Sequence, residues 1–414
     1  MQRKLMTELV AWKSRTRRKP LLLHGARQTG KTYLLNEFGI TQYPDLAYFN
    51  LEQSQRSSAV FDGELEPARI ISLLAAQRGR PILPGDTLVI LDEIQKNPRA
   101  LTALKYFYES APEYHIAAAG SLLGITLGRS QDSFPVGKVN ALTLHPLDFE
   151  EFLWAQGQSL LAQAIRDAYL KMEAFALHET ALELYRQYLA VGGMPEAIVE
   201  FNERQGFLGF GETLRQIDQG YIADMAKYAS PQEGGRIIEV WESVPGQLRK
   251  ANHKFQYNKV RSGGRAKQYE VPIAWLKTAR VINKCPCAEV MEEPLSLSAD
   301  NDNFKIYLLD TGLLCAKLGV DPALIHEDTL ESAQFRGILA ENYLMQQLVA
   351  KDIQPSFWKS PGKAEVDFVI NDKNDGIIPI EVKSGDNVRS FSLNVYRDRY
   401  QPSYALRFST KNFG

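Results

Sequence analysis

The stretch GARQTGKT, from Gly25 to Thr32, has the residue types and the spacing of a loop that holds phosphate groups. Gly25 and Gly30 bracket four residues, and Lys31 and Thr32 follow at once, which is the G-x-x-x-x-G-K-[ST] pattern. Glycines let the backbone curl so that successive N–H groups point toward phosphate oxygens. We expect Lys31 to reach the β- and γ-phosphates of ATP and Thr32 to offer its hydroxyl to Mg²⁺. The residues expected to contact the nucleotide are Gly25, Ala26, Arg27, Gln28, Thr29, Gly30, Lys31, Thr32 and Tyr33.

A second stretch, DTLVILDEIQK (residues 86–96), supplies two acids directly after an apolar run. This order predicts a buried strand with Asp92 and Glu93 at its carboxyl end, where ligands collect in open α/β sheets. Asp92 suits a role in binding Mg²⁺, and Glu93 suits the base that polarises the water attacking the γ-phosphate. A third strand, within YHIAAAGS, ends at Ser121, a small polar residue that could contact the γ-phosphate and sense it.

Each of these features also has a plainer interpretation. The glycine-lysine-threonine pattern can arise by chance, acids often follow strands because loops are polar, and Ser121 could be an ordinary helix N-cap. The apolar strand expected before the loop and the helix expected after it argue against a chance match. The two motifs together favour a site that hydrolyses ATP.

Charged residues near the C-terminus form a second candidate site. On a helical wheel Glu341 falls inside the apolar stripe of QFRGILAENYLMQQLVA, and a buried acid is costly unless it is paired or binds a metal. Strand alternation places Asp367 beside Glu365 on one face, and Glu381 beside Lys383 on another. We expect Asp367 and Glu381 to bind Mg²⁺. The catalytic set for metal-assisted phosphodiester hydrolysis would be Glu341, Asp367, Glu381 and Lys383, with Lys383 positioning the water.

This C-terminal cluster also has an alternative interpretation. Strand ends commonly carry ordinary salt bridges, and Lys383 could pair with Asp367 or Glu381 without any metal. The acid at Glu341 favours a metal-binding site, whereas cleavage of a nucleic acid at that site is a weaker expectation.

The elements that must position these residues follow from the hydrophobic pattern along the chain. Alternating strand and helix signals over residues 1–145 predict an α/β fold with a parallel, doubly wound sheet that forms the P-loop ATPase core. Residues 146–210 read as helices of a lid, interrupted by two glycines before Pro195. Residues 211–325 read as three helices followed by an extended stretch, the pattern of a winged helix. Residues 326–414 form the C-terminal α/β domain.

Composition and cysteine content set bounds on the class of protein. The chain has 414 residues, of which 44% are hydrophobic and 23% charged, as in an ordinary globular protein. No apolar run reaches the ~18 residues of a membrane-spanning helix, and the basic N-terminus lacks the apolar core of a secretory signal. Cys285, Cys287 and Cys315 have neither a metal-binding spacing nor an even disulfide framework. We therefore expect a cytoplasmic protein with no membrane partner.

Positive charge is concentrated in two segments of a chain whose formal net charge is −1. Residues 249–284 contain ten lysines and arginines and one acid, and residues 1–20 contain seven and one. Such segments attract polyanions by releasing counterions, so we expect DNA to bind through residues 249–284. Lys267, Lys277 and Arg280 would lie on or near the third helix of the winged helix. Both segments could instead be solvated surfaces, and a winged helix can also serve only in packing or in dimer contacts.

These motifs, in this order, resemble a known family. GARQTGKT, LVILDEIQ, AAGS, LHPLDFEEFL, VGGMPEA, YLLDTGLL, FRGILAENY, AEVDFVI and IPIEVKSG span residues 20 to about 410. The chain is similar to prokaryotic P-loop ATPases of the AAA superfamily (AAA/ASCE class) that carry a C-terminal domain of unknown function, DUF4143. The resemblance implies ATP and Mg²⁺ as cofactors, a winged helix, and a C-terminal domain with the restriction-endonuclease-like, PD-(D/E)XK fold. It also implies that Ser121 belongs to the ATP site and that the chain could form a homo-oligomer.

The chain departs from that family at a position that matters for catalysis. Where relatives often have Gly-Arg, this chain has Lys138, and a lysine lacks the planar fork with which arginine stabilises charge on a neighbouring subunit's nucleotide. Arg129 is the nearby substitute that we would test as a catalytic arginine.

Three functions stay open on the sequence. The first is an ATP-hydrolysing enzyme that acts on nucleic acid and has a Mg²⁺-dependent nuclease domain. The second is an ATP-dependent regulatory switch in which the nuclease-like fold only binds a partner or DNA. The third is a DNA-binding ATPase that never cuts.

Overall fold

The computed structural model describes residues 1–127, 135, 137–227, 229–250, 254–327, 329–383, 385 and 390–413. The chain divides into two compact units, Met1–His145 and Pro146–Gly414, which are described separately below. The first unit covers the residues expected to form the ATPase core. None of the helices in the described ranges combines the length and the apolar character that a membrane crossing requires.

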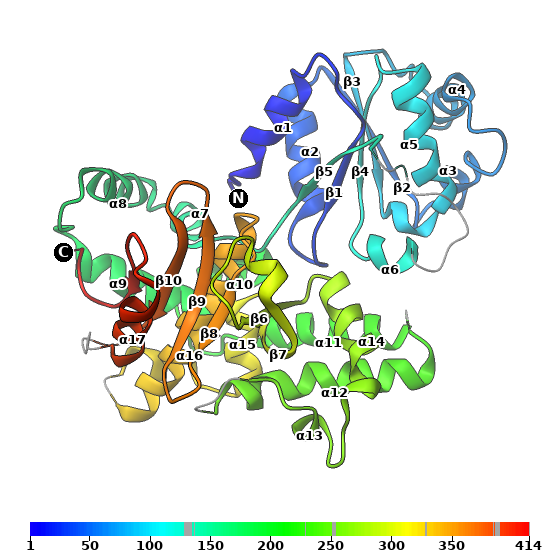
Figure 1. Cartoon of the computed structure of the whole chain (residues 1–414). Helices are drawn as coiled ribbons and strands as arrows, with labels where there is room; N and C mark the ends of the chain where they lie inside the picture. Colours follow the sequence, from blue (N-terminus) through cyan, green and yellow to red (C-terminus); the bar gives the residue numbers. More distant parts are fainter. Residues whose placement is uncertain are drawn as a thin grey trace. The chain divides into compact units, whose positions relative to one another are not determined.

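The first unit is built on a parallel five-stranded sheet (Figure 1). This architecture confirms the predicted parallel α/β sheet. The strand order is β2-β3-β4-β1-β5, so β1 and β3 lie on either side of β4, and their carboxyl ends open at the same edge of the sheet. The strands are β1 (Leu21–His24), β2 (Asp45–Asn50), β3 (Thr87–Asp92), β4 (His115–Ala119) and β5 (Asn140–Thr143).

Two hydrophobic cores cover the two faces of this sheet. One core packs α1 and α2 against β1, with Trp12 and Phe38 buried. The other packs α4, α5 and the segment after α3 on the opposite face, with Phe61 and Phe107 buried. All six residues of β3 are buried, as expected for a central parallel strand. The helices are α1 (Leu5–Lys13), α2 (Lys31–Gln42), α3 (Gln55–Ala59), α4 (Pro67–Arg78), α5 (Pro98–Ser110) and α6 (Leu123–Leu127), with a 3₁₀ turn η1 (Ile94–Lys96).

Most of the helices in the described ranges lie in the second unit. The break predicted before Pro195 is present, because one helix ends at Val191 and the next begins at Pro195. Helices over 146–210 belong to this unit rather than to the nucleotide unit. The helices over 146–210 are α7 (Phe149–Ala155), α8 (Ser159–Lys171), α9 (His178–Val191) and α10 (Pro195–Arg204). The later helices are α11 (Glu212–Lys227), α12 (Pro231–Leu248), α13 (Tyr257–Val260), α14 (Ala266–Thr278), α15 (Thr311–Leu318), α16 (Leu330–Ala350) and α17 (Phe391–Tyr400). The unit also has the 3₁₀ turns η2 (Leu295–Ser298) and η3 (Pro322–His326).

A buried carboxylate holds the two glycines at the break between α9 and α10. Asp310 is fully buried, and its Oδ2 accepts a hydrogen bond of 2.6 Å from the Gly193 N–H. A Cβ atom at Gly193 would lie 2.1 Å from the Leu147 carbonyl oxygen, so only glycine fits there. The VGGMPEA and YLLDTGLL motifs are therefore explained by a close packing contact within the second unit.

A six-stranded mixed sheet forms the centre of the second unit (Figure 1). The hairpin that follows α14 was expected to be the wing of a separate winged-helix domain, but its first strand, β6, also pairs in parallel with β8. The expected division between residues 211–325 and 326–414 therefore runs through one continuous sheet. Its order is β11-β10-β9-β8-β6-β7, from β6 (Ile282–Ala288), β7 (Ala299–Leu308), β8 (Ser356–Lys359), β9 (Glu365–Asp372), β10 (Gly376–Val382) and β11 (Leu406–Phe408).

Candidate functional site

The predicted phosphate-binding loop is a curled turn between β1 and α2. Gly25, Gln28 and Gly30 have φ angles of +149°, +64° and +91°, which is the region that glycine adopts most readily. A Cβ atom at Gly25 would lie 2.3 Å from the Leu144 carbonyl oxygen, so this glycine is required by space as well as by conformation. Because α2 begins at Lys31, its unpaired N–H groups and its partial positive charge are at the end of the loop.

Lys31 lies inside this loop and is 8% exposed. Its Nζ donates to the carbonyl oxygens of Gly25 at 3.1 Å and Ala26 at 2.7 Å. Burial lowers the pKa of Lys31 to about 8, against the opposing effect of the Glu93 and Asp92 carboxylates. The ammonium group is thus buried mainly among neutral carbonyl groups, which leaves it suited to pair with an incoming anion.

Thr32 and Asp92 are joined as the two motifs predict. Thr32 Oγ1 donates to Asp92 Oδ2 at 2.8 Å, and the Tyr48 hydroxyl donates to the same oxygen at 2.8 Å. The other carboxylate oxygen, Oδ1, accepts from the Glu93 N–H at 3.0 Å. These contacts hold the Asp92 carboxylate beside the threonine hydroxyl, and sequence reasoning did not identify Tyr48.

Glu93 is held in a left-handed conformation, with φ +53°, directly after β3. Its Oε2 accepts a hydrogen bond from Gln95 Nε2. Burial raises the pKa of Glu93, and the Asp92 charge raises it further, while the bond from Gln95 acts in the opposite direction. Ser121 follows β4 and is half-buried between the strands that carry the loop and the acids. These positions are compatible with the roles expected for both residues.

The remaining residues of the loop differ in exposure. Thr29 is fully buried, and its Oγ1 donates to the Ala26 carbonyl at 3.0 Å, whereas Arg27, Gln28 and Tyr33 are exposed. Arg3, which the sequence analysis did not single out, donates from Nη1 to the Thr29 carbonyl at 3.0 Å and from Nη2 to the His145 carbonyl at 2.6 Å. These two hydrogen bonds from Arg3 therefore hold the phosphate-binding loop in place.

The candidate arginine for charge stabilisation, Arg129, lies outside the described residues. The Nζ of Lys138 lies 3.1 Å from Glu109 Oε1. Its Nζ also lies 5.3 Å from the centroid of the Tyr108 ring. Lys138 is thus engaged within its own unit.

These residues fit ATP with Mg²⁺. The loop offers backbone N–H groups, a helix N-terminus and a buried ammonium for phosphate, and the Thr32 hydroxyl and Asp92 carboxylate supply the oxygen ligands that Mg²⁺ prefers. The fit rests on the donor set and on the curled glycine backbone.

The C-terminal carboxylates surround a lysine that sequence reasoning missed. Lys305, on β7, is 1% exposed, and its Nζ lies 3.2 Å from Glu341 Oε1 and 2.9 Å from Glu365 Oε1. The Tyr307 hydroxyl also donates to Glu341 Oε1. Burial alone would lower the pKa of Lys305, but the Glu341 and Glu365 carboxylates outweigh burial and raise it. A charged ammonium therefore lies among these acids.

Asp367, Glu381 and Lys383 lie at the meeting edge of β9 and β10. Because Ile380 pairs with Phe368, the next positions along the two strands are Glu381 and Asp367. Asp367 Oδ2 accepts from the Val382 N–H at 2.8 Å. Burial and the nearby Glu341 charge raise the pKa of Asp367, while Lys305 opposes this shift. Glu381 accepts from Ser390, and its Oε1 lies 2.5 Å from Lys383 Nζ.

The carboxylates of the predicted Mg²⁺ site already have partners within the protein. Across the described ranges, no group of three or more His, Cys, Asp or Glu side chains is placed to hold a metal ion. Glu341 is bonded to Lys305 and Tyr307, and Glu381 to Ser390 and Lys383, so their oxygens already have donors. Binding of Mg²⁺ by Asp367 and Glu381 stays a prediction, and in this structure two lysines lie beside the acids of the cluster.

The basic segment 249–284 is largely at the surface. Lys267, Lys277 and Arg280 are exposed, as is Arg261, whose Nη1 lies 3.7 Å from Glu239 Oε1. Lys284 is half-buried, with Nζ 4.1 Å from the centroid of the Phe304 ring. Most of this charge is therefore accessible on and around α13 and α14.

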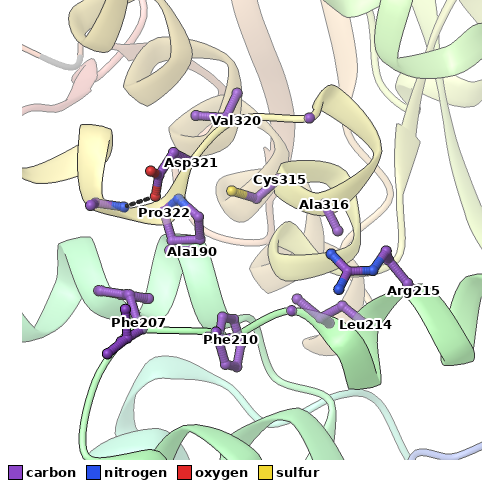
Figure 2. Close-up of a pocket in the computed structure, with 15 residues that line it drawn as sticks. Ala190, Phe207, Phe210, Leu214, Arg215, Cys315, Ala316, Val320, Asp321 and Pro322 are labelled. Carbon is purple, nitrogen blue, oxygen red and sulfur yellow. Dashed lines mark hydrogen bonds between the residues drawn. The ribbon is translucent and has the colours of Figure 1, made fainter.

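A further cavity, of about 580 Å³, lies between the 207–215 segment and α15 (Figure 2). Phe207, Phe210 and Leu214 line one side, and Cys315 and Pro322 line the other. Its polar groups have partners already: Arg215 bonds to Glu212, and Asp321 accepts from the Ala323 N–H. The cavity is mainly apolar, and sequence reasoning placed no function there.

Comparison with known proteins finds a family match for most of the first unit. Residues 17–153 match the family model of an AAA domain. The first unit thus carries the fold and the motifs of an AAA-type P-loop ATPase. Residues 182–324 match a domain of unknown function (DUF8612), and residues 336–413 match a domain of unknown function (DUF4143). No curated protein matches the chain.

Several solved structures are similar to the chain at low identity. The ORC2 protein of Aeropyrum pernix, in ADPNP–ADP complexes, is 15% identical with a TM-score of 0.41, and the match covers 78% of this chain and 94% of that one. The A. pernix ORC1 protein in complex with DNA is 11% identical, with a TM-score of 0.29 and coverage of 77% and 91%. AMPPCP-bound DnaA from Aquifex aeolicus is 15% identical, with a TM-score of 0.29 and coverage of 66% and 85%.

Proposed function

We propose that the first unit binds and hydrolyses ATP. The observation that carries this proposal is the 2.8 Å hydrogen bond from Thr32 Oγ1 to Asp92 Oδ2, which joins the phosphate-binding loop to the acidic strand end. Chance matches to the two motifs would not place these groups in contact. Bound Mg²⁺ would neutralise charge on the phosphate oxygens.

Different residues of the site have different roles in ATP hydrolysis. The loop amides, the start of α2 and the Lys31 ammonium bind phosphate oxygens, and Thr32 with Asp92 would hold the metal. Glu93 accepts the proton of the attacking water, and its raised pKa brings the carboxylate closer to the range useful for a base near neutral pH. Ser121, which follows β4, is placed to sense the γ-phosphate.

The substitution Glu93→Gln separates binding from hydrolysis. We expect the variant to bind ATP·Mg²⁺ with nearly unchanged affinity and to lose about 10²-fold or more in turnover. Calorimetry and a phosphate-release assay measure the two quantities. Glu113→Gln is the matched control, because Glu113 is exposed and lies in the turn before β4. Turnover by Glu93→Gln at the rate of the control would remove Glu93 from the mechanism.

We also propose that the second unit binds nucleic acid through the basic segment 249–284. Supporting this proposal are the exposed lysines and arginines on and beside α13 and α14, including Arg261, Arg265 and Lys267. Phosphate contacts of this kind provide affinity without sequence specificity. A homo-oligomer, in which a neighbouring subunit contributes an arginine such as Arg129 to the nucleotide, stays a prediction.

Charge reversal tests the nucleic-acid interface. Replacing Arg261, Arg265 and Lys267 by Glu should weaken DNA binding and lower the slope of log K against log salt by about 0.9 for each lost phosphate contact. The control reverses three exposed lysines elsewhere in the same unit, namely Lys171, Lys351 and Lys373. An equal loss in both variants would show that the segment has no special role.

A second candidate function, a switch that does not cut, is favoured by Lys305. The C-terminal segment runs helix, three strands, helix, strand (α16, β8, β9, β10, α17, β11), and we propose that this nuclease-like fold is retained for binding. The ammonium group at the centre of the acids supports this reading over phosphodiester cleavage. ATPase rate with and without DNA, and a nicking assay on the same sample, distinguish the two functions. DNA-stimulated turnover with intact DNA is expected, whereas nicking that Asp367→Ala abolishes would establish a nuclease.

A further inference from the structure

A second, smaller cavity of about 220 Å³ opens between α9, α16 and the ends of β10 and β11. This volume is below the ~300–1,000 Å³ of pockets for drug-sized ligands, so the cavity suits a compact group or the end of a longer ligand. The polar side chains that line it are Arg186, Arg336, Lys383, Tyr185, Tyr343, Ser409 and Thr410.

The charges that line this cavity are all positive. Arg186 comes from α9, Arg336 from α16 and Lys383 from the end of β10, and the described lining includes no aspartate or glutamate. Lys383 is paired with Glu381, so the charge that a ligand would meet comes chiefly from the two arginines, which would repel each other less with an anion between them. This convergence suggests that the cavity is built for a negatively charged group.

Arg186 provides the most direct sign of a missing partner. Its Nε is enclosed and has no hydrogen-bond partner in the described part of the chain. Leaving a buried donor unsatisfied costs about 1–3 kcal/mol, more for a charged group. The planar guanidinium is suited to bidentate bonds with phosphate or carboxylate oxygens.

The other two cations are held in position by the protein. Arg336 Nη1 donates to the Ile325 carbonyl at 3.1 Å and to Ser332 Oγ at 2.8 Å. The Lys383 side chain is held by Glu381, and its backbone N–H donates to the Phe408 carbonyl at 2.8 Å. A ligand entering this cavity would therefore meet side chains that are already oriented.

Two tyrosines complete the wall of the cavity. Tyr185 and Tyr343 are in edge-to-face contact, with ring centroids 5.1 Å apart. Burial raises the pKa of both phenols, so their hydroxyl groups stay protonated and can donate hydrogen bonds to an anion. A rigid aromatic wall beside cationic donors suits an anionic group carried on a larger, partly apolar ligand.

We propose that this cavity binds a phosphoryl group, with Arg186 as its principal ligand. A phosphate monoester carries about −1.5 to −2 charges near neutral pH and three acceptor oxygens, which matches several converging donors better than a single carboxylate does. The phosphoryl group belongs to a free phosphate compound or to the phosphorylated end of a nucleic acid. This site lies in the second unit and does not depend on the ATP site of the first.

The test uses the full chain with Lys31→Ala, which removes phosphate binding by the loop. Calorimetric titration with inorganic phosphate should show binding, and the added substitution Arg186→Gln should weaken it by about tenfold or more. Arg186→Lys should have an intermediate effect. Arg166→Gln is the matched control, since Arg166 is an exposed arginine of α8 that bonds to Glu150, and it should leave binding unchanged.

Two oligonucleotides that differ only in a 5′-phosphate identify the source of the phosphoryl group. Tighter binding of the phosphorylated strand that depends on Arg186 supports a nucleic-acid end, and a response to inorganic phosphate alone supports a small compound. Failure of Lys31→Ala to bind any of these probes, or affinity that is equal in Arg186→Gln and Arg166→Gln, would overturn the proposal. The single variant Arg186→Gln should keep normal ATP turnover and thermal stability, so a failure here is separable from a failure of the ATPase assignment.

Discussion

Lys31 in the first unit and Lys305 in the second are both buried ammonium groups, but they lie among different oxygens. Lys31 Nζ bonds to the neutral carbonyl groups of Gly25 and Ala26, and burial lowers its pKa to about 8. Lys305 Nζ lies against the carboxylates of Glu341 and Glu365, which raise its pKa despite burial. The first lysine still lacks an anionic partner in its own loop, and the second is already neutralised. From this comparison we infer that the first site is open to an external anion, whereas the acids of the second already have cationic side chains beside them.

The largest expected effect is the loss of ATP turnover in Lys31→Ala. Removing the ammonium takes away charge that should act on the β- and γ-phosphates, so we expect the turnover rate to fall by about 10²–10³-fold. A phosphate-release assay measures the rate. Lys105→Ala, on α5, is the control lysine and should behave as the parent protein. Unchanged turnover in Lys31→Ala would show that Lys31 does not act on the phosphates of ATP.

Lys305→Met should affect stability rather than turnover. The change leaves Glu341 buried without its ion-pair partner, and breaking a buried pair in this way costs about 3–5 kcal/mol of unfolding free energy. Urea unfolding followed by the fluorescence of the second unit measures the loss. The double variant Lys305→Met/Glu341→Gln should recover part of it, because neither charge is then left alone. A loss below about 1 kcal/mol in Lys305→Met would mean that the pair does not neutralise the cluster.

The two lysines should also differ in pH dependence. Lys31 must be protonated to attract phosphate, so nucleotide affinity should fall as pH rises above about 8, by up to about tenfold per pH unit. Because its folded-state pKa is below that of the unfolded chain, the nucleotide-free protein should gain stability between pH 8 and about 10.5 as Lys31 loses its proton. Calorimetry with ATP·Mg²⁺ from pH 7 to 9.5 measures the affinity. An affinity that stays constant from pH 7 to 9.5 in the parent protein would contradict the low pKa of Lys31.

The smallest expected effect concerns Tyr48, which shares an acceptor with Thr32. Tyr48→Phe removes one hydrogen bond to Asp92 Oδ2 and leaves the other, so turnover should fall by only about 2–10-fold. Tyr106→Phe is a control, because Tyr106 is an exposed tyrosine of the same unit. A fall as large as that of Lys31→Ala would show that Tyr48 has a role beyond orienting Asp92.

The first unit could be predicted in detail because its chemistry is local in sequence. The curled loop, the buried strand before Asp92 and the helix at Lys31 all arise from residues within a few positions of one another. What could not be predicted is support from a distance, such as the bonds from Arg3 to the carbonyl groups of Thr29 and His145. No sequence pattern shows whether a basic residue near a terminus bonds to a distant loop or is solvated.

The second unit was harder to predict because its cluster combines four separate elements. Helical spacing placed Glu341 in the apolar stripe of its helix, where it is buried, and alternation placed Asp367 on one face of its strand with Glu365. Neither pattern gave information on which strand would lie opposite. Lys305 sits between Phe304 and Ile306, and a lysine within an apolar strand was the one available signal that a cation joined the acids. The pairing of β6 with β8, which merges the hairpin into the C-terminal sheet, depends on long-range contacts that no local pattern records.

Counting bound Mn²⁺ by electron paramagnetic resonance tests the central claim most directly, since Mn²⁺ substitutes for Mg²⁺ at oxygen ligands. The titration is made on the full chain with and without a non-hydrolysable ATP analogue. We predict one tightly bound ion per chain with the analogue, lost in Lys31→Ala, and none without it. A tightly bound ion in the nucleotide-free protein that disappears in Asp367→Ala would contradict the inference that Lys305 and Lys383 take the place of a metal among the C-terminal acids.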